Sequence, residues 1–168
     1  MAKFIKKGTT TPLTEEATIG SSAGAGDAGK LVHLDGAGKL DSTFMPTGFG
    51  ADTRTVTAGE TIAAGDLIYI DSAGEAFKAD ANDATKEAVG FVLAGITAAA
   101  TGTAYFGSGI ITGLSGLTAG ARYYLSASTP GGVATAIPSG AGDIVQQVGK
   151  ALSATELYFE PQASILLI

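Results

Sequence analysis

The chain has 168 residues and a mass of 16.6 kDa, and small residues dominate it: 25 are Gly, 30 are Ala and 20 are Thr. Cys and Trp are absent and His33 is the one histidine, which excludes a disulfide scaffold, a thiolate metal site, a Cys nucleophile and a multi-histidine metal centre. The net charge of −6 and the pI of about 4.6 argue against nucleic-acid binding through a basic face.

Residues 1–50 are predicted to form an extended N-terminal arm with zero net charge. Residues 8–12 end in a proline, and the residue before a proline favours extended backbone. Residues 14–17 are predicted to begin one helical turn, and the small residues 20–29 form a flexible stretch. Residues 30–40 contain the glycine-bearing turn 35–38 and predict a small hairpin. We place the boundary of the arm at residues 48–50.

Residues 51–168 carry the whole net charge of −6 and predict an all-β domain, a short-stranded antiparallel barrel or sandwich. Turn signals recur every 8–12 residues and no amphipathic helical pattern interrupts them. The predicted strands are 54–57, 67–70, 76–78, 89–93, 103–106, 109–112, 122–126, 133–137, 144–152, 156–160 and 164–168.

Residues 88–121 contain no charge, and this uncharged stretch is in principle long enough to cross a bilayer. Eight Gly, five Thr and two Ser interrupt every apolar run in this window, so a buried sheet explains it better and no membrane partner is expected. The N-terminus is basic but lacks the apolar stretch of a signal peptide, so we expect synthesis in the cytoplasm without secretion.

Residues 24–30 match two phosphate-binding patterns, GxGxxG and GxxxxGK. Both patterns work only between a strand and a helix, where backbone N–H groups converge on phosphate. Neither flank of this loop predicts such an element, and Leu31 stands where a P-loop needs a hydroxyl. We therefore expect no nucleotide and no other cofactor.

Catalytic and metal-binding residues are not expected either. His33 has no second catalytic group near it in the sequence, so a structural or interface role is favoured. Residues 80–83 resemble the start of a calcium loop but lack its later Gly and Glu. The carboxylates Asp66, Asp71 and Glu75 fall in turns, where Asp forms local hydrogen bonds. We predict that the protein is not an enzyme.

The two ends of the chain are the candidate contact sites. The basic and apolar peptide Lys3, Phe4, Ile5, Lys6 and Lys7 is suited to docking on an acidic partner surface, or else is a solvated terminus. The chain closes with the apolar run Ile165, Leu166, Leu167 and Ile168. Exposed, such a strand promotes aggregation, so it is expected to pair with a sheet or with a neighbouring subunit, and we favour a subunit interface.

Two stretches carry a resemblance to a known class of proteins. Residues 27–35, 38–41 and 45–48 (DAGKLVHLD, GKLD and MPTG) resemble an arm-like segment of tailed-bacteriophage structural proteins. Residues 113–125 (GLSGLTAGARYYL), Pro130–Gly132 and 145–157 (VQQVGKALSATEL) resemble a β-rich module of phage head-fibre, capsid-decoration and tail-fibre proteins. The shared positions are turn and core residues, so the resemblance transfers no functional residue.

The resemblance implies a structural protein on the capsid surface of the virion. The expected function is a homotrimeric capsid-decoration (cement) or head-fibre protein, whose partner is the major capsid protein and whose arm threads across capsomers. The alternative is a tail-fibre or receptor-binding module that recognises the host surface. A glycan-degrading virion enzyme would need a carboxylate pair in a cleft, which the sequence does not indicate.

Overall fold

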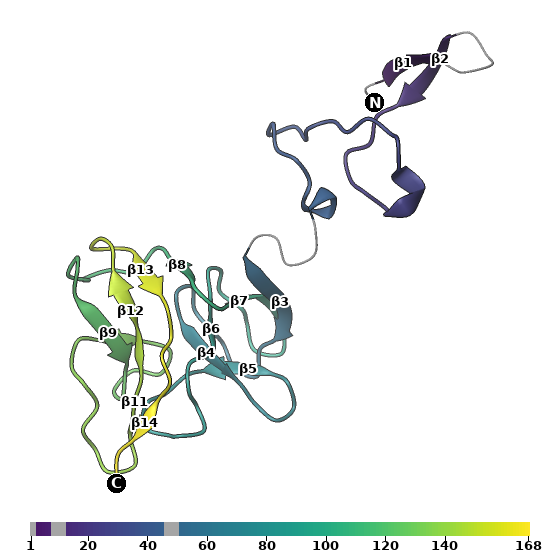
Figure 1. Cartoon of the computed structure of the whole chain (residues 1–168). Coiled ribbons are helices and arrows are strands. Elements are labelled where there is room, and N and C mark those ends of the chain that lie inside the picture. Colours follow the sequence, from purple (N-terminus) through teal and green to yellow (C-terminus); the bar gives the residue numbers. More distant parts are fainter. Residues whose placement is uncertain (1–2, 8–12, 46–50) are drawn as a thin grey trace. The chain divides into compact units, whose positions relative to one another are not determined.

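The computed structural model describes residues 3–7, 13–45 and 51–168. Backbone contacts divide the chain into two compact units, Met1–Gly50 and Ala51–Ile168, which we call the N-terminal unit and the β domain. The described ranges contain strands and two short 3-10 helices but no α-helix, so the prediction of an all-β fold is confirmed (Figure 1). The extended stretch predicted at 8–12 and the boundary predicted at 48–50 lie outside these ranges.

The N-terminal unit begins with an antiparallel hairpin of β1 (Lys3–Lys7) and β2 (Leu13–Ala17). The helical turn predicted at 14–17 is therefore wrong. An isolated helical turn fixes three residues for one hydrogen bond, whereas strand pairing gives these residues a ladder along all of β1. Two 3-10 helices follow, η1 (Ala25–Asp27) and η2 (Ser42–Phe44).

The hairpin predicted at 30–40 forms its turn but not its strands. The Gly38 N–H donates to the Asp35 carbonyl at 3.0 Å, and the Asp35 N–H donates to the Lys39 carbonyl at 2.8 Å. Upstream of the turn, Val32 makes a single parallel bridge with Ile19 and no antiparallel partner strand. The side chain of Asp35 accepts the N–H groups of Ala37 and Lys39, so local hydrogen bonds satisfy this backbone in place of a ladder.

The β domain contains two open five-stranded antiparallel sheets. The first sheet has the order β3-β7-β6-β4-β5. Its strands are β3 (Asp52–Thr57), β4 (Leu67–Ile70), β5 (Ala76–Lys78), β6 (Gly90–Val92) and β7 (Thr101–Phe106). The predicted strands 67–70 and 76–78 are confirmed at both ends, because tight turns with Gly65 and Gly74 at positive φ bracket them.

The second sheet has the order β10-β9-β12-β13-β8, and it faces the first across the domain (Figure 1). Its strands are β8 (Gly109–Ile111), β9 (Arg122–Leu125), β10 (Val133–Ala134), β12 (Gln147–Ala151) and β13 (Leu157–Phe159). A separate two-stranded sheet joins β11 (Ile144–Val145) to β14 (Ile165–Leu166). No sheet closes on itself, so the domain is a sandwich of open sheets.

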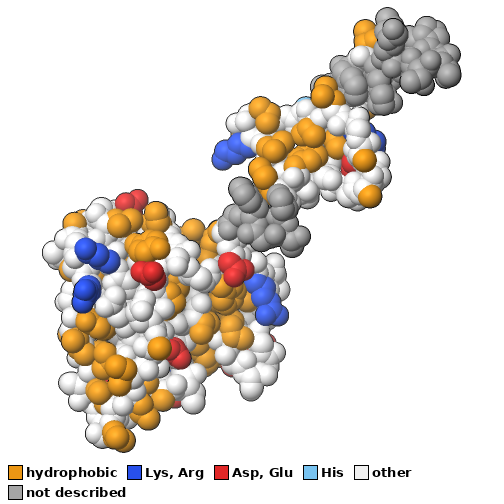
Figure 2. All heavy atoms as spheres, in the orientation of Figure 1, with side chains coloured by type: hydrophobic (Ala, Val, Ile, Leu, Met, Phe, Trp, Pro, Cys, Tyr) orange, Lys and Arg blue, Asp and Glu red, His pale blue; other side chains and the backbone are white. Residues whose placement is uncertain are grey.

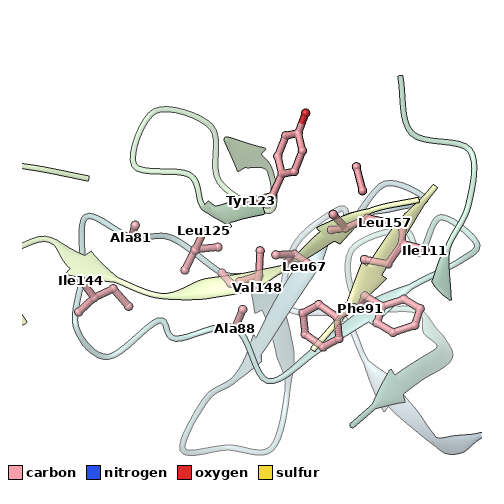
Figure 3. Close-up of a cluster of buried hydrophobic side chains, with 13 residues drawn as sticks. Leu67, Ala81, Ala88, Phe91, Ile111, Tyr123, Leu125, Ile144, Val148 and Leu157 are labelled. Atoms are coloured by element: carbon pink, nitrogen blue, oxygen red, sulfur yellow. The ribbon is translucent and has the colours of Figure 1, made fainter. Parts of the chain in front are cut away.

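A large hydrophobic cluster lies between the two five-stranded sheets. The first sheet contributes Leu67 and Phe91, and the second contributes residues such as Ile111, Leu125 and Phe159. Figure 3 shows these side chains converging from both sheets. Tyr123 points its hydroxyl away from the cluster, where it accepts the N–H of Thr118 at 2.9 Å. This cluster is the larger of the two hydrophobic cores of the β domain.

The opposite face of the first sheet has a smaller cluster of its own. Ile68 and Val92 point to this face, and connecting segments cover them with Ile62 and Ile96. Those two isoleucines pair by an isolated antiparallel bridge. Alternate residues of β4 and β6 thus enter different clusters, which is the period-2 pattern of a strand buried on both faces. The β domain therefore has hydrophobic cores on both faces of its first sheet.

The predicted strand 144–152 is divided into β11 and β12 at Gln146. The side chain of Gln146 is almost fully buried and bonds to the backbone of Ala88, while its own carbonyl accepts the Leu125 N–H at 2.9 Å. The β9–β12 register shifts between Gln147 and Gly149, a β-bulge. A buried amide that bonds to another segment thus interrupts what the composition predicts as one strand.

Candidate docking surfaces

The described residues of the N-terminal unit leave several large apolar side chains exposed. Among its residues whose burial the structure describes, Thr18 is the one buried residue, and none belongs to either core cluster. Its exposed large hydrophobic residues are Ile5, Leu31, Val32, Leu34, Leu40 and Met45. Figure 2 shows hydrophobic side chains spread over the described part of this unit. Covering a Leu, Ile or Val side chain contributes roughly 1.5–3 kcal/mol, so a partner surface would gain substantial stability here.

Polar contacts give the described part of this unit its local structure. Asp27 Oδ1 lies 2.7 Å from Lys30 Nζ, and Asp27 Oδ2 accepts the Ala23 N–H at 2.6 Å. These contacts hold the pKa of Asp27 below its usual value, with the hydrogen bond from Lys30 as the largest cause. Thr43 Oγ1 accepts the Ser22 N–H at 2.7 Å, which ties two loops together across 21 residues. Exposed hydrogen bonds, and not an apolar core, shape these loops.

Asp41 fixes Thr43 for that contact. Its Oδ1 accepts the hydroxyl of Thr43 at 2.6 Å and the N–H of Thr43 at 2.9 Å. The hydroxyl bond is the larger cause and the N–H bond the second cause of a lowered Asp41 pKa. The ionised carboxylate therefore stabilises the loop that reaches back to Ser22.

His33 lies at the parallel bridge of the N-terminal unit. Its N–H donates to the Ile19 carbonyl at 3.0 Å, and a Cβ added at Gly20 would lie 3.0 Å from the imidazole Nε2. The ring Nδ1 is buried without a hydrogen-bond partner among the described residues. The ring packs on the Gly20 backbone, and the structural or interface role of His33 stays a prediction.

The predicted docking peptide, residues 3–7, is not a free tail. It is β1, and β2 lies in register opposite it, with Glu15 across from Ile5 and Glu16 across from Phe4. The structure describes the side chain of Ile5, which is 69% exposed. Sequence reasoning treated the Lys-rich peptide alone and missed that an acidic strand of the same chain pairs with it. The signal for this pairing was the charge complementarity between the lysines of 3–7 and the acidic residues Glu15 and Glu16.

The predicted C-terminal contact residues form an exposed strand on the β domain. Within β14, Ile165 and Leu166 pair with Val145 and Ile144 of β11, and Leu167 continues the pairing through hydrogen bonds with Asp143 and Gly142. Ile165 is 66% exposed, Leu166 is 52% exposed, and Ile168 is exposed as well. Figure 2 shows hydrophobic side chains gathered where Figure 1 places β14 and the C-terminus. The backbone thus pairs with the chain's own sheet while the apolar side chains remain uncovered.

In the other motifs that the sequence singled out, polar groups form hydrogen bonds and an ion pair with residues nearby in the sequence. In the glycine-rich segment 24–30, the Lys30 ammonium pairs with Asp27, and no α-helix, which a phosphate site needs, follows the segment among the described residues. In the segment 80–83, Asp80 accepts the Asn82 N–H and Asp83 accepts the Thr85 N–H. The described residues contain no group of three or more His, Cys, Asp or Glu that could hold a metal ion.

The uncharged window 88–121 forms β6, β7 and β8 of the β domain. Within the described ranges, no helix has the length and apolar character needed to cross a membrane.

Two hollows on the β domain were not predicted. One, of about 250 Å³, lies near β10 and β11 and is lined by small and hydroxyl-bearing residues such as Ser126, Ser128 and Ser139. The other, of about 260 Å³, lies beside β4 and β5 and is lined by Glu60, Tyr69, Phe77, Lys78, Asp80, Lys86 and Pro130. We call the second the β4–β5 pocket. Its residues come from five separate segments, so no sequence motif could reveal it.

The chain was compared with known proteins by sequence. No protein-family model matches it, and no curated protein matches it.

Proposed function

We propose that the chain is a structural virion protein that decorates the outer surface of a bacteriophage capsid as a homotrimer. The proposal begins from the resemblance of residues 27–48 and 113–157 to phage structural proteins. One structural observation carries it further, namely the contrast between the two units. The β domain has its own hydrophobic cores, whereas the described side chains of the N-terminal unit enter no core and leave six large apolar residues exposed.

That contrast fits an element that gains its stability by docking. A segment that cannot bury enough apolar surface alone orders its side chains when it covers a partner. In the proposed assembly the N-terminal unit lies against the major capsid protein and crosses between capsomers, so that its apolar residues bridge neighbouring subunits. The β domain remains on the outer surface of the shell. Decoration of this kind stabilises the capsid because the protein binds the assembled shell more tightly than separated capsomers.

The trimer is proposed to bury the exposed apolar strand. Ile165, Leu166 and Ile168 extend from a two-stranded sheet whose backbone is already paired in part, so a neighbouring protomer would cover side chains and meet a sheet edge. Closed cyclic symmetry removes such edges from solvent in all three copies at once.

Co-sedimentation with mature capsids of the phage that encodes the chain tests the proposal. Purified full-length protein is expected to bind the capsids and to raise their melting temperature. A parallel sedimentation with host cells separates the alternative, because a tail-fibre or receptor-binding module would bind cells and leave capsids unchanged. Binding to cells without binding to capsids would overturn the proposal.

A further inference from the structure

The β4–β5 pocket has an aromatic wall. Tyr69 of β4 and Phe77 of β5 are direct cross-strand partners, so their side chains lie on the same face of the first sheet. Their rings stack with centroids 5.7 Å apart and an interplanar angle of 26°. Gly59 supports the wall from behind, because a Cβ at this position would overlap with the tip of the Phe77 ring. The strand pairing and this close approach together fix the wall in place.

Two carboxylates of the pocket are oriented by backbone N–H groups. Glu60 Oε1 accepts the Lys78 N–H at 2.9 Å, and Asp80 Oδ1 accepts the Asn82 N–H at 3.0 Å. The second oxygen of each carboxylate has no hydrogen-bond partner among the described residues. Both residues are half-buried and line the pocket, and the bond to a backbone N–H restricts the orientation of each carboxylate. Acceptors that are held in position in advance cost little entropy when a ligand binds.

Lys86 adds an ammonium group to the polar lining, and this group also reaches Asp83 at 3.4 Å. Lys78 lines the pocket next to Phe77, but neighbouring residues of a strand point to opposite faces, so its side chain lies on the other face from the aromatic wall. A charged ligand of either sign would meet a like charge, from Lys86 or from Glu60 and Asp80. A neutral ligand with several hydroxyl groups can use the charged donor and the charged acceptors at once.

The size and the chemistry of the pocket point to one class of ligand. The volume of about 260 Å³ is slightly below the roughly 300–1,000 Å³ of sites for drug-sized molecules. A single pyranose ring suits such a space. Its C–H face packs on an aromatic wall by dispersion and burial of apolar surface, while its hydroxyl groups donate to carboxylates and accept from ammonium groups.

We propose that the β4–β5 pocket is a saccharide-binding site that takes one neutral pyranose unit, with its C–H face on Tyr69 and its hydroxyl groups on Glu60, Asp80 and Lys86. All four residues belong to the β domain, so the site does not depend on the N-terminal unit or on a role at the capsid. The sugar would belong to a glycan at a surface that the β domain meets.

NMR of the isolated full-length protein tests the site without any capsid. The probes are a set of neutral methyl glycosides (of glucose, galactose, mannose, rhamnose and N-acetylglucosamine) at millimolar concentrations. At least one is expected to shift the backbone amide signals of Lys78 and Asn82 saturably, because these N–H groups donate to the two pocket carboxylates. N-acetylneuraminic acid and glucosamine, as charged probes, are expected to bind more weakly than the best neutral glycoside.

Two substitutions locate the binding. Tyr69→Val removes the ring and keeps a residue that favours strands, and Lys86→Met removes the ammonium and keeps the apolar stem. Each is expected to weaken binding of the best glycoside by about tenfold or more. Tyr158→Val in β13 and Lys150→Met in β12 are the matched controls outside the pocket, and they are expected to leave the affinity unchanged.

Glu60→Gln is a variant that is expected to weaken binding without unfolding the protein. It keeps an oxygen that accepts the Lys78 N–H and removes the charge, so the spectrum should remain that of the folded protein while binding weakens. The proposal is overturned if no neutral glycoside gives saturable shifts at Lys78 and Asn82. It is also overturned if a charged probe binds better than every neutral one, or if the pocket variants bind as the controls do.

Discussion

Gln146 and Ala88 exchange two hydrogen bonds in the interior of the β domain. The Ala88 N–H donates to Gln146 Oε1 at 2.9 Å, and Gln146 Nε2 donates to the Ala88 carbonyl at 2.9 Å. The same Nε2 lies 3.3 Å from the Gln162 carbonyl, on the segment that leads into β14. Glu87 beside this pair accepts the Ser164 N–H at 3.1 Å. One buried amide and its neighbour thus anchor the C-terminal strand to the core.

Gln146→Leu is expected to destabilise the β domain by about 2–4 kcal/mol, because it leaves the buried N–H and carbonyl of Ala88 without partners. Urea unfolding followed by circular dichroism measures the change. The control is Gln162→Leu, whose exposed side chain bonds only to the nearby Glu160 carbonyl and whose loss is expected to be small. Equal stabilities for the two variants would contradict the anchoring role of Gln146.

Gly149→Ala is expected to destabilise the second sheet by about 1–3 kcal/mol or more, because it adds a methyl group to a packed interior. A Cβ at Gly149 would overlap with the Tyr158 carbonyl oxygen of the paired strand β13, so the two backbones would have to separate. Gly95→Ala is the control, because the nearest atom to a Cβ there is the Ile62 carbonyl oxygen at an ordinary 3.5 Å. Thermal unfolding of both variants should show a loss at Gly149 alone.

The strands of the β domain could be predicted where local signals agree. In residues 67–70 and 76–78, β-branched and aromatic residues lie between glycine turns, and the structure has β4 and β5 at those bounds. Local sequence signals failed to predict the strands where a contact with a distant segment determines the structure. The composition of 144–152 indicates one strand, but the buried bonds of Gln146 to Ala88 divide it. The acidic residues 14–17 became a strand because β1 supplied the partner ladder.

The candidate surfaces were predictable only in part. The apolar run Ile165, Leu166, Leu167 and Ile168 is evident from the sequence, and its predicted role at a subunit interface stays a prediction. The pairing of this run with β11 depends on residues about 20 positions away. The β4–β5 pocket was missed, because Glu60, Asp80 and Pro130 meet only after the sheet has formed. In the sequence, Asp80 indicated only the start of an incomplete calcium loop, and no pattern singled out Glu60.

Acid is expected to loosen the N-terminal unit. The folded-state pKa of both Asp27 and Asp41 is lowered, so their contribution is complete above the ordinary aspartate value of about 3.9 and is lost as the pH falls through the lowered value. The amide signals of Ala23 and Thr43, whose N–H groups donate to these carboxylates, measure the transition. Asp27→Asn should disturb the Ala23 signal already at neutral pH. A titration midpoint above the ordinary aspartate value would contradict the assignment.

Ile165→Asp is expected to dissociate the proposed trimer, because it places a charge on the exposed apolar strand while leaving the backbone pairing of β14 with β11 intact. Light scattering should give the wild-type protein a mass of about three times the 16.6 kDa chain and the variant the mass of one chain. Leu152→Asp, at another exposed apolar residue of the β domain, is the matched control and should remain trimeric. A wild-type protein with the mass of one chain would contradict the proposed trimer.

One comparison tests most directly the proposal that the N-terminal unit binds the capsid while the β domain folds on its own. Full-length protein and a fragment of residues 51–168, which holds both core clusters, are sedimented with mature capsids of the encoding phage. We predict that the fragment is folded, with the unfolding transition of the β domain retained, and that it stays in the supernatant while the full-length chain sediments with the capsids. A folded fragment that binds the capsids as tightly as the full chain would contradict the account.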